Sequence, residues 1–150
     1  MRHNRNMPTF YIVDTNVVIA GLITSQTASP VAQVLDRMLN ASLPFVLSPT
    51  LLAEYRSVML RPKIAARHGL LADEVDTILT DIARHAVMLQ PGPPAANHAK
   101  APDPGDQMLW DLLALRPDLV LVTGDLRLLA SEAMAPRVIT PAVLVDRLTQ

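Results

Sequence analysis

Acidic residues stand at the edges of apolar segments in this chain, and their chemistry is the first feature to explain. They are Asp14 after Tyr11-Ile12-Val13, Glu54 after Leu51-Leu52-Ala53, Asp103 and Asp106 around Pro104-Gly105, and Asp125 after Val122-Thr123-Gly124. A carboxylate beside buried segments is costly to ionise unless a cation meets it. Several carboxylates, each contributed by a different segment of the chain, indicate a shared, oxygen-rich site for a hard divalent cation such as Mg²⁺ or Mn²⁺.

Asp14 and Asp125 each have a plainer explanation in the local sequence. Asp14 precedes Thr15-Asn16 and fits a residue that caps the next helix, and Asp125 fits a β-turn. An aspartate at a strand end also suggests a phosphatase nucleophile, but that family expects a second aspartate where this chain has Asn16. The local sequence leaves a structural and a functional interpretation open for both carboxylates.

Glu54 and the pair Asp103 and Asp106 are open to the same two interpretations. Glu54 fits an exposed helix glutamate, because Tyr55 and Arg56 indicate that one face of this helix is open. Asp103 and Asp106 flank a proline-glycine turn at a helix start, where negative charge is favourable. One of them is explained as a cap, but two acids so close repel each other unless a cation or proton intervenes.

Strand and helix signals alternate along the chain. Apolar, often β-branched segments predict strands at 9–13, 45–47, 119–123 and 138–139. Cap signals and apolar periodicity predict helices at 17–23, 30–40, 49–60, 72–86, 106–115, 126–132 and from 141 onward, with Pro62 ending the third of them. Residues 90–104 contain five of the 13 prolines and predict a long loop.

This alternation predicts an α/β fold with a mostly parallel central sheet that helices cover on both faces. Ligands of such sheets bind at the carboxyl ends of the strands. Asp14 and Asp125 fall at the carboxyl ends of two predicted strands, so the functional interpretation places them where a ligand is expected.

Length and composition predict one domain over residues 9–150, preceded by a flexible arm at 1–8, with Met1 and Met7 both open as the native start. Half of the residues are hydrophobic, yet no apolar run approaches the roughly 18 residues that span a bilayer. No signal peptide is recognisable. The absence of cysteine excludes disulfides and thiolate metal sites and fits a cytoplasmic protein.

The formal net charge of −1 provides no global attraction for a nucleic acid, so RNA binding requires a local basic patch. An aromatic content of 3% argues against a platform that stacks bases. A solvated helix face, with Arg61 or Lys63 paired to Glu54, is the structural alternative to such a patch. The candidate residues for a basic RNA-binding patch are Arg56, Arg61 and Lys63 with Arg67 and His68, and, as a second patch, Arg2, His3 and Arg5.

The order of these motifs resembles that of a PIN domain, and more closely the PIN-family toxins of bacterial toxin–antitoxin systems. The motifs are Ile12-Val13-Asp14-Thr15-Asn16, Leu52-Ala53-Glu54-Tyr55, Asp103-Pro104-Gly105-Asp106 and Val122-Thr123-Gly124-Asp125 with Leu128-Leu129. The likeness covers about residues 10–148 and implies a three-layer α/β/α sandwich and a Mg²⁺- or Mn²⁺-dependent endoribonuclease.

The resemblance also assigns roles to individual residues. It implies that the catalytic and metal-binding acids are Asp14, Glu54, Asp106 and Asp125, with Asp103 as an extra acid of this subgroup. It places Thr15, Asn16 and Thr123 as small polar residues that support the site. It further implies attack by water that leaves 5′-phosphate and 3′-hydroxyl ends, a homodimer, and an antitoxin partner that blocks the acidic groove.

Two other functions stay open at this stage. A metal-free ribonuclease would use histidines as acid and base, and the chain has His3, His68, His85 and His98 in no recognisable arrangement. A non-catalytic RNA-binding or interaction module on a PIN scaffold is the second alternative. Sensitivity to EDTA separates the first from metal-dependent cleavage, and metal titration separates the second.

Overall fold

A computed structural model describes residues 9–93 and 99–150, so the predicted arm at 1–8 lies outside the described residues. The described residues form one five-stranded sheet in the order β3-β2-β1-β4-β5, and every neighbouring pair is parallel. The strands are β1 (Tyr11–Val13), β2 (Phe45–Leu47), β3 (Val87–Met88), β4 (Val120–Val122) and β5 (Val138–Ile139). The sequence did not predict β3, a two-residue edge strand whose side chains are exposed and which therefore lacks a buried apolar pattern.

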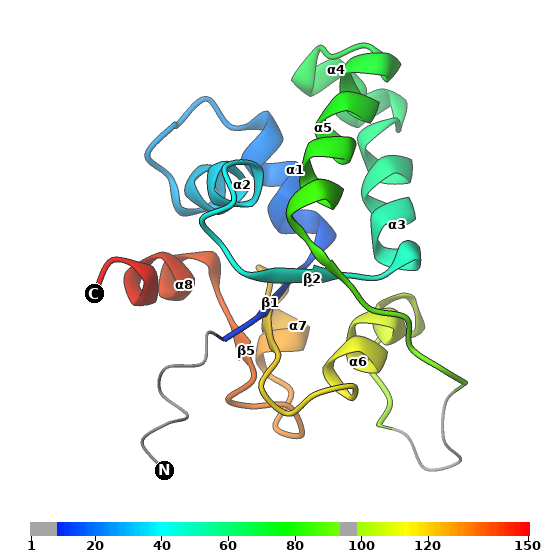
Figure 1. Ribbon diagram of the computed structural model, residues 1–150, viewed down its shortest axis with the longest axis vertical. Helices are drawn as coiled ribbons and strands as arrows, with labels where there is room; N and C mark the ends of the chain where they lie inside the picture. Colours follow the sequence, from blue (N-terminus) through cyan, green and yellow to red (C-terminus); the bar gives the residue numbers. More distant parts are fainter. Residues whose placement is uncertain (1–8, 94–98) are drawn as a thin grey trace.

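Helices cover the sheet on both sides, with α1, α2 and α5 on one side and α6 and α7 on the other (Figure 1). This confirms the predicted three-layer α/β/α architecture. The helices are α1 (Thr15–Ile23), α2 (Pro30–Leu39), α3 (Pro49–Met59), α4 (Pro62–His68), α5 (Ala72–His85), α6 (Gln107–Leu113), α7 (Leu126–Leu129) and α8 (Pro141–Leu148), with a 3₁₀ turn η2 (Pro104–Asp106) before α6.

The helix α4 was not predicted. Pro62 was expected only to end the preceding helix, and it also occupies the first turn of a new one, where a proline needs no hydrogen-bond partner for its nitrogen. Gly69 ends α4 in the left-handed conformation, with φ of 68°. The result is a short helix that projects beyond α3 and carries several basic residues.

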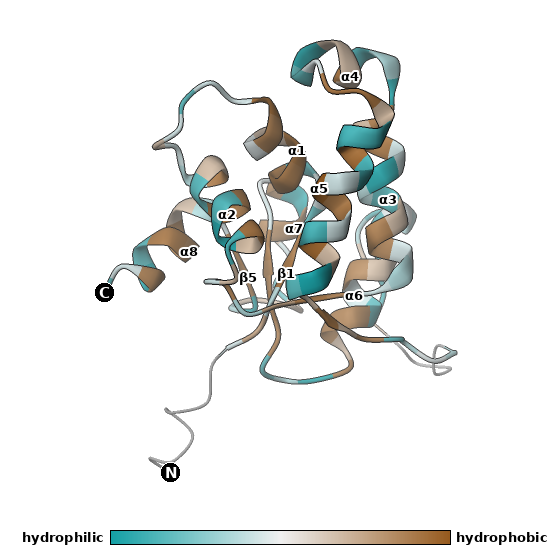
Figure 2. Ribbon diagram, turned by 45° about the horizontal axis from the view of Figure 1, so that its top comes forward, coloured by the Kyte–Doolittle hydropathy of each residue, from teal (hydrophilic) through white to brown (hydrophobic). Residues whose placement is uncertain are grey.

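The core lies between the sheet and its helices. All three residues of β1 and of β2 are buried, as expected for parallel strands covered on both faces. In Figure 2 the central strands have the hydrophobic colour, whereas the helices combine hydrophobic and hydrophilic segments. No helix within the described parts of the chain is both long and apolar enough to cross a membrane.

The strand order creates a switch point between β1 and β4. From β1 the chain moves outward to β2 and β3, and then returns to the other side of β1 to form β4 and β5. The loops that leave β1 and β4 therefore part in opposite directions, which opens a crevice at the carboxyl ends of these strands. The backbone N–H of Asp14 donates to the carbonyl of Val122 at 2.9 Å and holds the two strand ends together.

Gly21 permits the close packing of α1 against α2, and its replacement tests this contact. A Cβ at this position would lie 2.6 Å from the Val31 carbonyl oxygen and 3.0 Å from Leu35 Cβ. Alanine improves helix propensity by about 1 kcal/mol, but overpacking costs about 1–3 kcal/mol, so Gly21→Ala should lower the unfolding free energy in urea. The control Gly92→Ala meets no atom within 4 Å and should have little effect. Equal stability of the two variants would contradict this packing.

Candidate functional site

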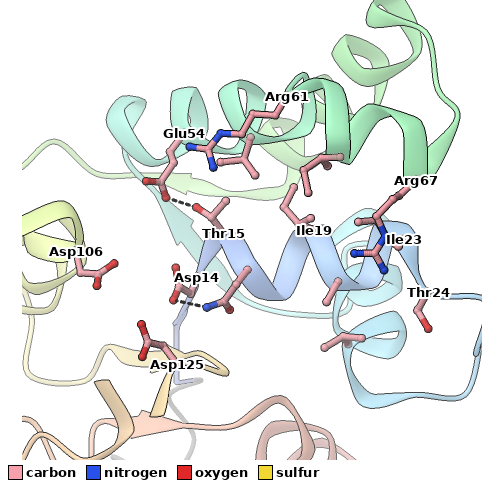
Figure 3. A pocket seen from close by; sticks show the side chains of 15 residues that line it. Asp14, Thr15, Ile19, Ile23, Thr24, Glu54, Arg61, Arg67, Asp106 and Asp125 are labelled. Atoms are coloured by element: carbon pink, nitrogen blue, oxygen red, sulfur yellow. Dashed lines mark hydrogen bonds between the residues drawn. The ribbon is translucent and has the colours of Figure 1, made fainter. Parts of the chain in front are cut away.

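A cavity of about 690 Å³ opens at this crevice and extends along α1 toward α4. Asp14, Glu54, Asp106 and Asp125 all line it, although they come from four separate segments of the chain (Figure 3). The structure therefore brings together the four acids that the resemblance singled out, whereas Asp103 does not line this cavity.

Asp14 directly follows β1 and is only 5% exposed. It occupies the N-cap position of α1, yet its side chain makes no cap hydrogen bond, so capping does not explain this carboxylate. Its Oδ2 instead accepts the Thr123 hydroxyl at 2.7 Å and the Asn16 side-chain amide at 3.2 Å. These donors order the carboxylate but bring no positive charge.

Thr123 and Asn16 also join the end of β1 to the end of β4. The Thr123 hydroxyl accepts the backbone N–H of Asp125 at 3.0 Å, and the Asn16 side-chain oxygen accepts that of Gly124 at 3.4 Å. Asp125 caps α7 by accepting the backbone N–H of Arg127 at 2.9 Å. Its turn role and its place in the cavity are therefore compatible.

Glu54 is placed by its neighbour in α3. Tyr55 was expected to mark an open helix face, and this was wrong, because Tyr55 is fully buried and its hydroxyl donates to the carbonyl of Val13 at the end of β1. This bond anchors α3 over the strand end and directs Glu54 toward Thr15, whose hydroxyl donates to the Glu54 carboxylate. Among the described residues Glu54 forms no ion pair, so the structural alternative, in which it pairs with Arg61 or Lys63, does not hold.

The structure separates the roles of Asp103 and Asp106. Asp103 Oδ1 accepts the backbone N–H of Gly105 at 2.8 Å, and its Oδ2 lies 3.4 Å from Arg127 Nη1. Asp106 makes no side-chain cap bond at the start of α6 and is half-buried at the cavity. Asp103 is therefore the turn and cap residue, and Asp106 remains available for chemistry.

The carboxylates destabilise one another's charged forms. Burial raises the pKa of Asp14 from 3.8 to about 6; the Thr123 hydroxyl opposes this shift, and the charges of Asp106 and Glu54 add to it. Burial also raises the pKa of Asp106, as do the charges of Asp125 and Asp103, while Arg127 opposes the shift. The cluster carries negative charge with little positive compensation.

The chemistry of these side chains fits a hard divalent cation. Carboxylate oxygens are the preferred ligands of Mg²⁺ and Mn²⁺, and no histidine is among the residues found to line the cavity. Within residues 9–93 and 99–150, however, no group of three or more histidine or acidic side chains is arranged so that it could hold a metal ion. A cation would therefore have to draw the carboxylates closer together than they lie here.

The predicted basic residues divide between two surfaces. Arg61 lines the cavity, as does Arg67, whereas Lys63 is exposed and does not line it. Arg56 forms an ion pair with Asp76 at 2.8 Å and lines a different hollow, between α3 and α5. The other basic candidates, Arg2, His3 and Arg5, lie outside the described residues.

Sequence reasoning missed the aliphatic part of the cavity. Its lining includes Ile19, Ile23, Val31, Val58 and Ile64, from α1, α2, α3 and α4. Where apolar periodicity marked these residues, it predicted only that they belong to the core. No sequence signal separates a core position from a cavity wall, because both are apolar and recur with the same helical spacing.

Comparisons with known proteins agree with the observed fold. Residues 11–127 match the family model described as PIN domain. Among solved structures, the chain is similar to PAE2754 from Pyrobaculum aerophilum, with 18% sequence identity, a TM-score of 0.58, and coverage of 94% of this chain and 90% of that chain. At this identity the likeness to PAE2754 concerns the fold alone. A comparison with curated proteins finds no match.

The raised pKa of Asp14 predicts a pH dependence of stability without added metal. Because the folded state binds this proton more tightly than the unfolded chain, its stabilisation is complete below about pH 4 and is lost as the pH rises to about 6. The full loss is at most about 3 kcal/mol, at roughly 1.4 kcal/mol per pKa unit. Asp14→Asn should remove this pH dependence. In urea unfolding, the unfolding free energy of the variant should therefore rise relative to that of the wild type between about pH 4 and pH 6. A constant difference across this range would contradict the raised pKa.

Proposed function

The chain belongs to the PIN domain family, and from this premise we propose that it is a metal-dependent endoribonuclease that hydrolyses RNA phosphodiester bonds. PIN domains form a nuclease superfamily and generally use divalent metal ions. The observation that carries the proposal is the convergence of Asp14, Glu54, Asp106 and Asp125 on one cavity. Mutual repulsion within this group favours a cation as its partner.

Each part of the site has a role in this proposal. Asp14, Glu54, Asp106 and Asp125 would hold Mg²⁺ or Mn²⁺, and a bound cation of this kind lowers the pKa of water and neutralises charge on the phosphate. The supporting residues keep these carboxylates oriented, since Thr123 and Asn16 bind Asp14, and Thr15 binds Glu54. Asp103 is not included among the ligands, because Gly105 and Arg127 engage its oxygens.

The histidine-based alternative is less consistent with the described residues. The His68 ring binds the Met59 carbonyl at 2.8 Å and the Leu70 backbone N–H at 2.9 Å, so both ring nitrogens have local partners. Neither His68 nor His85 is among the residues that line the cavity, and His3 and His98 lie outside the described residues. The non-catalytic alternative is disfavoured because all four acids are present.

The proposed biological role is that of a toxin in a type II toxin–antitoxin system of the cytoplasm. This role rests on the resemblance of the ordered motifs to PIN-family toxins. The deciding observation is genomic, because such a toxin requires a neighbouring reading frame for a short antitoxin with a DNA-binding pattern. Without that reading frame, the nuclease proposal stands and the toxin role does not.

A homodimer is part of the same proposal. It is supported by the resemblance and by the exposed apolar side chains of Val87 and Met88 on the edge strand β3, which are 41% and 47% exposed. Light scattering at micromolar concentration should give twice the chain mass of 16.3 kDa. A mass equal to one chain at the same concentration would refute the dimer.

Asp106→Asn tests the acid that has no capping role. The variant should lose cleavage of single-stranded RNA by roughly 100-fold or more, the scale of losing one group that stabilises transition-state charge. Without metal it should be as stable as the wild type or more stable, because a repelling charge is gone. The increase in melting temperature that Mg²⁺ or Mn²⁺ produces should shrink, since a ligand of the folded state stabilises according to its affinity.

Two comparisons make this experiment decisive. Asp36→Asn removes an exposed acid of α2 outside the cavity and should retain cleavage and the metal response. Excess EDTA should stop cleavage by the wild type. Normal cleavage by Asp106→Asn would exclude this residue from the site, and undiminished wild-type cleavage in EDTA would refute the carboxylate mechanism.

A further inference from the structure

The cavity has two parts of opposite chemistry. The carboxylates gather at one end, whereas the other end lies between α1, α2 and α4 and is walled by aliphatic side chains. These walls are not part of the fully buried core, because four of their side chains are only partly buried, namely Ile23, Val31, Val58 and Ile64. The whole volume, about 690 Å³, is typical of a site that encloses a small organic group.

Two arginines accompany the aliphatic part. Arg61 precedes the first turn of α4 and Arg67 lies in its last turn, and both are exposed. Figure 3 shows Arg61 near Glu54 and Arg67 near Ile23, at the two ends of the aliphatic wall. Within the described parts of the chain neither arginine forms an ion pair, whereas Arg56, Arg84, Arg116 and Arg127 all do.

We infer that this part of the cavity binds a single unpaired nucleotide of the RNA next to the cleaved phosphate, with its base on the aliphatic wall and its flanking phosphates at Arg61 and Arg67. The inference rests on the proposed function for the identity of the ligand. Arginine is suited to phosphate oxygens, and an apolar wall between two such cations matches a base between two phosphates.

This arrangement favours single-stranded over double-stranded RNA. A base can enter the aliphatic part only when it is unstacked and unpaired, which is how single strands and loops present their bases. The residues found to line the aliphatic part of the cavity include no aromatic side chain, and Thr24 is the one uncharged polar side chain among them. Recognition at this position should therefore depend on the presence of a base more than on its identity.

Binding of a short fluorescent single-stranded RNA, measured by anisotropy in EDTA, tests the inference apart from cleavage. Arg61→Gln and Arg67→Gln should each weaken binding roughly tenfold or more, the scale of one lost charge-assisted hydrogen bond. Each should also reduce the slope of log affinity against log salt by about 0.7, the value for one phosphate contact to a single strand. The matched control is Arg56→Gln, at an arginine that Asp76 already neutralises, and it should bind like the wild type.

Methyl NMR of the wild-type protein tests the aliphatic wall without any substitution. On addition of the same RNA in EDTA, methyl signals of Ile23, Val31 and Ile64 should shift, whereas those of Leu79 and Met88, in the separate hollow between α3 and α5, should not. The annealed duplex should leave both sets unmoved. Unmoved signals with the single strand would overturn the inference, as expected if the cavity is reserved for a segment of a partner protein.

The binding measurements on the three arginine variants can also contradict the inference. Equal affinity of all three variants, or a loss in Arg56→Gln as large as in Arg67→Gln, would show that RNA contacts the surface without using this site and would overturn the inference. The proposed function fails in a different way, through absence of cleavage with Mg²⁺ or Mn²⁺. That result combined with the expected binding pattern would refute hydrolysis and still support the nucleotide site.

Discussion

The ionisation of Asp14 in a buried position is the constraint on which the rest of the site depends. A carboxylate that is 5% exposed needs partners, and the fold supplies neutral donors, among them the Thr123 hydroxyl and the Asn16 amide. The charges that act on it, on Asp106 and Glu54, are negative and oppose its ionisation. Such an arrangement destabilises the metal-free protein. A divalent cation would relieve the repulsion between the carboxylates, and this relief would contribute to the affinity for the cation.

The architecture concentrates this charge by several independent contacts. The switch point of the parallel sheet brings the ends of β1 and β4 side by side. The bond from the Tyr55 hydroxyl to the Val13 carbonyl sets α3 above the same point. Arg127 lies 3.4 Å from Asp103 and 3.6 Å from Asp125, so it links the loop before α6 to the end of β4. Because Arg127 is 63% exposed, solvent screens its charge, and it offsets the cluster only weakly.

Local patterns in the sequence were sufficient for most of the fold. Apolar strands and proline-marked helix starts predicted most elements within a few residues, and their alternation predicted the parallel sheet. The order of the acidic motifs predicted PIN membership, which the family match confirms. Local patterns failed where a contact between distant segments decides the outcome. Tyr55 was expected at an open face, because nothing near it in the sequence reveals the Val13 carbonyl 42 residues away. The aliphatic cavity wall was missed for the same reason, since only the packing of α1 against α4 separates it from core.

The pKa of the Asp14 carboxyl, followed by carbon NMR with and without Mg²⁺, tests the central claim most directly. Without metal, its carboxyl signal should titrate near pH 6. With saturating Mg²⁺ the group should remain ionised well below that pH, because the cation stabilises the charged form. A midpoint near the ordinary value of 3.8 that does not respond to Mg²⁺ would show that Asp14 is neither strained by its neighbours nor bound to metal, and would contradict the account.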